Sequence, residues 1–254
     1  MSRNPTYPVP WLESGDPLPP PENACGPDTG IPGLLAISSS IELPRLRQAY
    51  HCGVFPWYSA NQPVLWWSPS PRMVLRTAEF RLHRSLRKHI AQGLRNGLLE
   101  IRMDVDFPSV IRACAKARRK GQSSTWIQPE LIDAYTILHH QGLAHSVETF
   151  WDGQRVGGLY AVNVGGMVYG ESMYAERTDA SKMALAALVA FCCRHGLETI
   201  DCQQETLHLA SLGAQPVSRS TFSNWVNRAV LLDSPQWQFT PEIWNELDPR
   251  LIPK

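Results

Sequence analysis

The stretch from Ala144 to Tyr174 constrains the fold most, because apolar and polar residues alternate along it in three runs. The dipeptides Asp152-Gly153 and Gly165-Gly166 separate these runs, and both favour the tight turns of β-hairpins. Two hairpins in succession join three antiparallel strands. The sequence therefore predicts a β-meander over Ala144–Tyr174.

A helix and a further strand follow the meander. The apolar run Ala180–Arg194 is predicted to be a helix, with Asp179 as its N-cap and Gly196 after its end. The β-branched pair Thr199-Ile200 then begins a strand, which can run parallel to the meander because a crossover helix precedes it. This order of elements is that of the GNAT-type acyltransferase fold. We expect an α+β protein with a GNAT-like acyltransferase domain, in which helices flank a mixed sheet.

The sequence before the meander is less regular. Residues 1–30 are rich in Pro and Gly and are expected to be irregular. Residues 53–75 hold three Trp and four Pro, which excludes a single regular element. Other predicted elements are helices at Glu42–Cys52, Arg81–Leu94, Pro108–Lys120 and Pro129–His140 and a strand at Leu98–Val105.

Composition predicts a globular chain with its cysteines reduced. A length of 254 residues with 43% hydrophobic content is enough to bury a core. No run of eighteen apolar residues occurs, and the N-terminus lacks the layout of a signal peptide, so we expect a cytoplasmic protein without a membrane segment. The six cysteines show no CxxC pair and are expected to be free thiols rather than metal ligands or disulfides.

Charge is unevenly distributed along the chain. Residues 81–120 carry eleven Lys and Arg against three acids, while the whole chain has a net charge of +1. An unpaired basic stripe suits a phosphate backbone, although a solvated helix face is the commoner reason for such a run. Four tryptophans could stack a nucleobase, although core packing is the ordinary role of each. The stripe comprises Arg81, Arg84, Lys88 and Arg95, and the tryptophans are Trp57, Trp66, Trp67 and Trp126.

Polar residues at two strand ends are candidates for chemistry. Strand alternation places Asp201 and Gln203 on one face, opposite Ile200 and Cys202. The same alternation groups Glu171 with Met167, Tyr169 and Met173. Ligands of α/β sheets commonly bind at the carboxyl ends of strands. The alternative is that these side chains hydrogen-bond loop backbone or pair with an Arg.

Acetyl-CoA is disfavoured as the acyl donor. CoA-dependent enzymes of this fold cradle the pyrophosphate on backbone amides of a Gly-containing turn that opens the crossover helix. No glycine lies between Gly170 and Gly196 in this chain. The sequence therefore favours another activated acyl group.

Eight motifs, spread in order over about Gly33–Phe222, make the chain resemble the bacterial leucyl/phenylalanyl-tRNA–protein transferase family. They are GVFPWYSANQPVLWWSPSPR, STWI, AHSVE, VGGLYAV, GESM, ASKMAL, IDCQ and HLASLGA. The resemblance implies a small N-terminal domain, at 1–70, and a GNAT-like catalytic domain, at 71–254. It also implies a cytoplasmic enzyme, usually a monomer, without a metal or other cofactor. It implies transfer of Leu or Phe, and Met less well, from the acceptor end of aminoacyl-tRNA to an N-terminal Arg or Lys of a protein. The product would be marked for N-end-rule degradation.

The resemblance also implies roles for individual residues. Trp57 and Trp126 match residues that hold the terminal adenosine, and Arg84 and Lys88 match basic residues on the acceptor stem. The predicted pocket for the transferred side chain comprises Leu159, Tyr169, Met173, Leu185, Leu188 and Ile200. The predicted catalytic centre is Glu171, Asp201 and Gln203. We expect Gln203 to hold the attacking amine, Asp201 to fix Gln203 and stabilise positive charge, and Glu171 to contribute hydrogen bonds.

Two departures from the family pattern occur. The N-terminal segment reads IPGLLAISSSIEL where the family has Pro-Asn-Gly-Leu-Leu-Ala followed by Gly-Gly-Asp-Leu, and Asp179 replaces the customary Asn, which we expect to keep a capping side chain. Three other functions stay open on the residues alone. They are a peptidoglycan-type aminoacyl transferase, a CoA-dependent N-acetyltransferase and a non-catalytic RNA-binding module.

Overall fold

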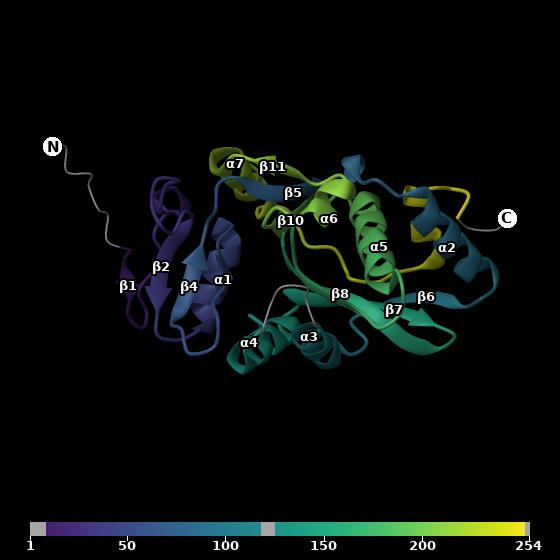
Figure 1. Ribbon diagram of the computed structural model, residues 1–254, viewed down its shortest axis with the longest axis horizontal. Helices are drawn as coiled ribbons and strands as arrows, with labels where there is room; N and C mark the ends of the chain where they lie inside the picture. Colours follow the sequence, from purple (N-terminus) through teal and green to yellow (C-terminus); the bar gives the residue numbers. More distant parts are fainter. Residues whose placement is uncertain (1–8, 118–124, 252–254) are drawn as a thin grey trace.

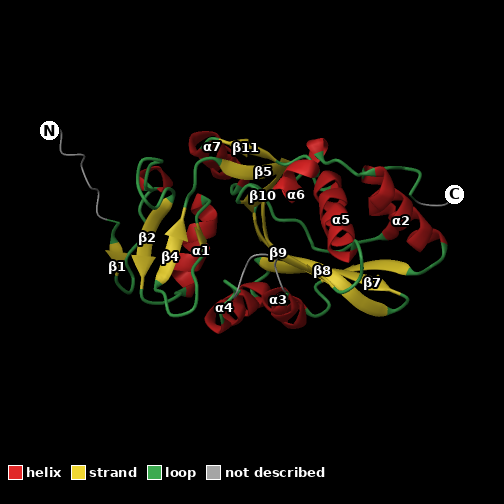
Figure 2. Cartoon of the chain, in the orientation of Figure 1, coloured by secondary structure: helices red, strands yellow, loops and turns green. Residues whose placement is uncertain are grey.

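The protein is described by a computed structural model at residues 9–117 and 125–251, and its chain forms two β-sheets (Figures 1 and 2). The smaller sheet has the strand order β1-β2-β4-β3. Its strands are β1 (Trp11–Leu12), β2 (Leu34–Ser38), β3 (Phe55–Pro56) and β4 (Val64–Trp67). Helix α1 (Leu43–Cys52) lies between β2 and β3 in the chain and ends at Gly53, which has a left-handed backbone with φ of 73°.

The larger sheet has the order β11-β5-β10-β9-β8-β7-β6. Its strands are β5 (Arg72–Arg76), β6 (Leu99–Met103), β7 (Ala144–Trp151), β8 (Gln154–Val164), β9 (Met167–Ala175), β10 (Thr199–Gln203) and β11 (Gln215–Val217). Strands β7, β8 and β9 form the predicted antiparallel meander. Helix α5 (Ala180–Arg194) crosses over to β10, which pairs parallel with β9. The predicted α+β class with a mixed sheet is confirmed.

Helices cover both faces of the larger sheet (Figure 1). Helices α3 (Phe107–Lys116) and α4 (Pro129–His140) pack on one face, and α5 packs on the other. The remaining helices are α2 (Arg84–Arg95), α6 (Leu207–Ser211), α7 (Arg219–Ala229) and three 3-10 turns, η1 (Pro21–Asn23), η2 (Thr77–Glu79) and η3 (Pro241–Glu246). Each face therefore has its own apolar cluster, one of them shared with the smaller sheet.

The sequence predicted helices α1 to α5 and strands β6 to β10, but not the other elements. Helices α4 and α5 have the predicted bounds, and α1 begins one residue later than predicted. Helix α2 starts at Arg84 rather than Arg81, and β6 is shorter than the predicted strand at each end. Helix α3 ends at Lys116 rather than Lys120, and residues 118–120 lie outside the described part of the chain.

The capping role predicted for Asp179 is wrong. Asp179 occupies the N-cap position of α5, but its side chain accepts no hydrogen bond from the helix amides. Its backbone is left-handed, with φ of 66°, and its carboxylate contacts Lys182 and His89 instead. Asn and Asp tolerate this backbone region better than other non-glycine residues. The backbone conformation therefore accounts for an Asn or Asp at this position.

The two sheets are joined by packing as well as by the chain. Trp67 ends the smaller sheet and Arg72 begins the larger one. A single apolar cluster includes Leu46 and Tyr50 of α1 together with Tyr135 and Tyr169 of the larger sheet and its helices. The domain boundary at residue 70 stays a prediction.

Other sequence predictions concern cysteines, metals and membranes. The thiols of Cys25, Cys52, Cys192, Cys193 and Cys202 are free. Within residues 9–117 and 125–251, no three His, Cys, Asp or Glu side chains are grouped so that they could hold a metal ion. No helix in the described ranges is long and apolar enough to cross a bilayer.

Gly53 should be intolerant of any side chain. An added Cβ would lie 2.7 Å from Phe222 Cε1, and the left-handed backbone is itself unfavourable for other residues. We expect Gly53→Ala to lower the free energy of unfolding by about 2–5 kcal/mol, as measured by urea denaturation. Gly196→Ala is the matched control, because Gly196 is also left-handed, with φ of 68°, but has open space around it. Equal losses in the two variants would contradict the steric argument.

Candidate active site

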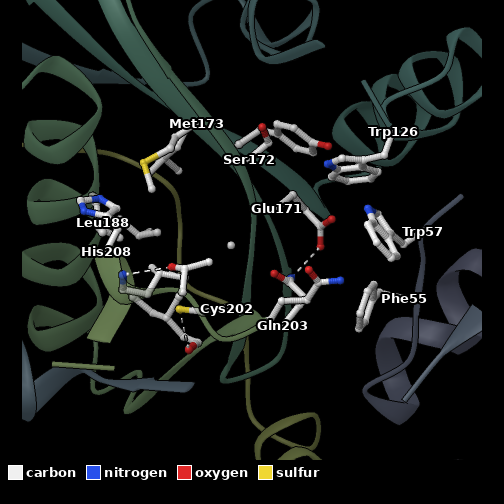
Figure 3. Close-up of a pocket in the computed structure, with 18 of the residues that line it drawn as sticks. Phe55, Trp57, Trp126, Glu171, Ser172, Met173, Leu188, Cys202, Gln203 and His208 are labelled. Atoms are coloured by element: carbon white, nitrogen blue, oxygen red, sulfur yellow. Dashed lines mark hydrogen bonds between the residues drawn. The ribbon is translucent and has the colours of Figure 1, made fainter. Parts of the chain in front are cut away.

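A cavity of about 440 Å³ opens between the middle of β9, the carboxyl end of β10, helices α5 and α6, and the segment after β3. Nine of the thirteen predicted site residues lie in its wall: Trp57, Trp126, Leu159, Glu171, Met173, Leu185, Leu188, Ile200 and Gln203. Glu171 and Gln203 face each other at one side, as Figure 3 shows, near Trp57, Trp126 and Phe55. The opposite side is mainly apolar and includes Met173 and Leu188. A mainly apolar cavity with a few convergent polar groups is the usual form of a small-molecule site.

Gln203 reaches the cavity because β10 does not keep its alternation. Pairing with β5 shifts between Asp201 and Gln203, and Gln203 has a left-handed backbone with φ of 55°. Gln203 therefore lines the same cavity as Ile200 and Cys202. The prediction that Asp201 and Gln203 point to one face is wrong, because regular alternation ends at this bulge.

A second bulge presents Glu171. Tyr160 of β8 pairs with Ser172, whereas the next residue of β8, Ala161, pairs with Gly170, so Glu171 is an extra residue on β9. The predicted grouping of Glu171 with both Tyr169 and Met173 is therefore wrong. Tyr169 lies before the bulge and packs toward α1, whereas Met173 lies after it and lines the cavity.

Tyr169 is not in the cavity wall, which corrects its predicted place in the side-chain pocket. Its side chain is fully buried, and its hydroxyl donates a 2.6 Å hydrogen bond to the backbone oxygen of Tyr50. Its ring packs edge-on against that of Tyr50, with centroids 5.0 Å apart. Tyr169 therefore supports the wall from behind.

The carboxyl group of Glu171 is held by neutral donors. Gln203 Nε2 donates to Oε1 at 3.4 Å, and the Tyr135 hydroxyl donates to Oε2 at 3.4 Å. Burial, and then the negative charge of Asp201, raise the pKa of Glu171 to about 8, although hydrogen bonds from Tyr50 and Tyr135 and the charge of Arg72 oppose the shift. Glu171 is therefore mostly protonated at neutral pH and can donate a hydrogen bond. The Gln203 amide oxygen is left to accept one from a ligand.

Asp201 is buried behind the cavity, against the prediction that it stabilises positive charge there directly. Arg72 Nε and an Nη atom donate to its two oxygens at 2.7 and 2.5 Å, and both side chains are almost completely buried. The guanidinium lies between the rings of Phe55 and Phe222, 4.6 and 4.5 Å from their centroids. Arg72 already neutralises the Asp201 charge. Asp201 also accepts a 3.0 Å hydrogen bond from the backbone amide of Gln203, so it fixes Gln203 through the main chain.

Sequence reasoning did not single out several residues of this site. Arg72 was visible as the Arg that closes the WWSPSPR motif, but its partner is 129 positions away. The sequence did not mark Tyr50 and Tyr135 as site residues, because a Tyr on a helix is ordinarily a packing residue. Other wall residues that were not predicted are Phe55, Cys202, Thr206 and His208.

The two tryptophans lie next to each other beside Glu171 (Figure 3). Trp57 is held by β4, because Trp67 Nε1 donates to its backbone oxygen at 2.7 Å and the two indoles pack edge-on. Trp126 lies just before α4. Both indoles therefore line the cavity on the side where Glu171 and Gln203 lie.

Arg84 and Lys88 are exposed on α2 and do not line the cavity. Two contacts tie their helix to the cavity walls. His83 bonds to the backbone oxygen of Ser211 at the end of α6, and His89 bonds to Asp179 at the start of α5. The basic face of α2 therefore lies beside the two helices that border the cavity.

The pKa of Glu171 predicts a pH-dependent loss of stability. The carboxyl is protonated in the folded chain up to about pH 8 but ionises near its ordinary value of 4.5 in the unfolded chain. The folded state therefore binds more protons between these values, and stability falls as pH rises through this window. Between about pH 5 and about pH 8, we expect the free energy of unfolding of the wild type to fall relative to that of Glu171→Gln, as followed by urea denaturation. Parallel pH curves for the two proteins would exclude the raised pKa.

The Arg72–Asp201 pair predicts strong coupling between these residues. Asp201→Ala leaves a buried guanidinium without a counter-ion and should lower the unfolding free energy by about 3–5 kcal/mol. The double variant R72M/D201L removes both charges and should recover much of this loss, as measured by urea denaturation. Additive losses from the two positions would contradict a buried pair.

Known proteins resemble the chain over most of its length. The family model described as leucyl/phenylalanyl-tRNA protein transferase matches residues 74–227, and the model of its N-terminal domain matches residues 39–70. The leucyl/phenylalanyl-tRNA–protein transferase of Burkholderia vietnamiensis is 58% identical over 231 residues, which cover 91% of each chain. That of a Polaromonas species is 53% identical over 240 residues, which cover 94% of each chain.

Solved structures are less similar to this chain than these relatives are. L-PGS from Bacillus licheniformis matches with a TM-score of 0.36 and 12% identity, over 68% of this chain and 54% of that one. An aminoglycoside acetyltransferase from a soil metagenome matches with a TM-score of 0.33 and 15% identity, over 57% of this chain and 97% of that one. Overlaps this weak carry no argument about function. The sequence relationships do, and by them the chain belongs to the leucyl/phenylalanyl-tRNA–protein transferase family of aminoacyltransferases.

Proposed function

We propose that this chain transfers Leu or Phe, and Met less well, from aminoacyl-tRNA to an N-terminal Arg or Lys of acceptor proteins. The modified proteins then become N-end-rule degradation substrates. The enzyme works in the cytoplasm as a monomer, without a metal or other cofactor. The observation that carries the proposal is an apolar cavity that ends at Glu171 and Gln203, beside two tryptophans.

The donor binds by its last nucleotide and its amino acid. Trp57 and Trp126 hold the terminal adenosine by stacking, which every nucleobase permits. The apolar walls receive the amino-acid side chain, where one methylene changes binding by about 1–3 kcal/mol. Charged side chains are excluded because they would lose their hydration without gaining a partner. The family relationship and the apolar lining support this arrangement.

The chemical step is aminolysis of an ester. The acceptor nitrogen attacks the ester carbonyl, the new C–N bond forms, the C–O bond to the ribose breaks, and the amine proton is passed to the ribose oxygen. An α-amino group has a pKa near 7.7–8.0, so about a tenth or more is neutral at pH 7. A strong base is unnecessary, and positioning supplies the larger effect.

Three residues position the reactants. The amide oxygen of Gln203 accepts a hydrogen bond from the attacking amine, since its nitrogen already donates to Glu171. Protonated Glu171 donates to the ribose or to the acceptor. Asp201 acts through the main chain, because it holds the amide of Gln203 and is itself neutralised by Arg72.

A transfer assay tests the function. The protein is incubated with labelled Leu-tRNA, or with labelled acetyl-CoA, and with a peptide that begins with Arg. Label on the peptide from Leu-tRNA is expected. Label from acetyl-CoA alone would instead identify an N-acetyltransferase, and retained tRNA binding without transfer would identify an RNA-binding module.

Gln203→Ala tests the role of the amide. We expect kcat to fall at least about tenfold, because one hydrogen bond in the transition state is removed, while the Kd for Leu-tRNA stays nearly constant. Single-turnover kinetics and filter binding measure the two quantities. Gln215→Ala is the control, because Gln215 is exposed on the edge strand β11. A kcat equal to that of the control would remove Gln203 from this role.

A further inference from the structure

Three basic side chains converge between α2 and the start of α5, outside the cavity. They come from the turn after β9, from the first turn of α5 and from α2, and they are Arg177, Lys182 and His89. Asp179 lies between two of them: Lys182 Nζ approaches its Oδ1 at 2.8 Å, and His89 Nδ1 approaches its Oδ2 at 3.2 Å. One carboxylate therefore orients two basic groups.

Trp151 orients the third. The Arg177 guanidinium lies over the Trp151 ring, 4.4 Å from its centroid, and the His89 ring lies 5.1 Å from the same indole. The groups stay accessible: 41% of the Lys182 side chain and 25% of the His89 side chain are exposed, and Arg177 is an exposed residue. The cluster is thus held in place without being covered.

The cluster lies between the basic face of α2 and the cavity. His89 follows Lys88 on α2. On the other side, Lys182 lies on α5 one turn before Leu185, which lines the cavity. Figure 1 shows α2 and α5 as neighbours on one side of the larger sheet. A polynucleotide strand that runs from Arg84 and Lys88 to the cavity therefore passes this cluster.

The chemistry of the cluster suits phosphodiester groups. Arg and Lys donate charge-assisted hydrogen bonds to phosphate oxygens, and a single acid, Asp179, does not cancel the positive charge. The turn that opens α5 contains no glycine, so side chains rather than bare backbone amides face a ligand here. This arrangement favours a flexible phosphodiester backbone that passes along the surface. It is less suited to a pyrophosphate bound in a glycine-containing turn.

We propose that Arg177, Lys182 and His89 bind phosphodiester groups of the single-stranded 3′ end of the tRNA, between the acceptor stem on α2 and the terminal adenosine at the cavity. The inference rests on the proposed function. It assigns these residues to donor binding rather than to chemistry, since none of them lines the cavity. It therefore requires that their removal affect a tRNA donor and spare a donor that has no phosphodiester.

The experiment compares two donors, Phe-tRNA and phenylalanyl-adenosine, in the double variant Arg177→Ala/Lys182→Ala. We expect KM for Phe-tRNA to rise about tenfold or more with little change in kcat, and kcat/KM for phenylalanyl-adenosine to stay unchanged. The slope of log Kd for tRNA against log salt should decrease by about 0.7 for each phosphate that the protein no longer neutralises. Lys182→Arg should keep most of the affinity, because it retains the charge.

Arg228→Ala is the control for the loss of an exposed positive charge, on α7, and should change neither KM nor the salt slope. Thermal melting checks that each variant is folded. Equal losses with both donors, or a salt slope identical to that of the control, would overturn the phosphate site while leaving the transfer reaction intact. If the wild type transfers from neither donor, the proposed function itself fails.

Discussion

The buried ion pair between Arg72 and Asp201 holds the polar end of the cavity in place. Removing two charges from water is costly, and here the cost is offset by bidentate geometry, by two aromatic rings and by a further bond from the amide of Gln203. The rings belong to Phe55 of the smaller sheet and Phe222 of α7. One interaction therefore ties β5 and β10 to β3 and α7, and the same carboxylate also accepts from the backbone amide of Gln203.

The site is made by two breaks in regular structure. In a regular β-strand, successive side chains point to opposite faces of the sheet. The side chains of Glu171 and Gln203 would then follow the alternation of the residues on either side of them. The bulge in β9 and the bulge in β10 each add one residue, and together they bring a carboxyl and an amide to one apolar cavity. Regular pairing between these strands resumes away from the cavity. The irregularity is thus confined to the place where polar groups are needed.

These breaks also explain what the sequence could and could not predict. The bounds of α4 and α5 followed from periodicity and from Pro and Gly at their ends, which are local signals. The places of Asp201 and Tyr169 did not follow, because a bulge is set by tertiary contacts. Arg72, which pairs with Asp201, is 129 residues away in the sequence, and a local sequence pattern does not reveal a contact at that separation. Nine of the thirteen predicted site residues nevertheless lie in the cavity wall, because the family motifs carry the residues themselves rather than their orientation.

The raised pKa of Glu171 fits the reaction that we propose. An ionised carboxylate beside the acceptor would stabilise its ammonium form and so lower the fraction of neutral amine. A protonated Glu171 removes this effect, and burial of the amine in the same surroundings favours its neutral form. The surroundings that raise the pKa of the acid thus also favour the nucleophile. Arg72 opposes the rise in the pKa of Glu171, but it also cancels the charge of Asp201, which would otherwise stabilise the ammonium form of the acceptor.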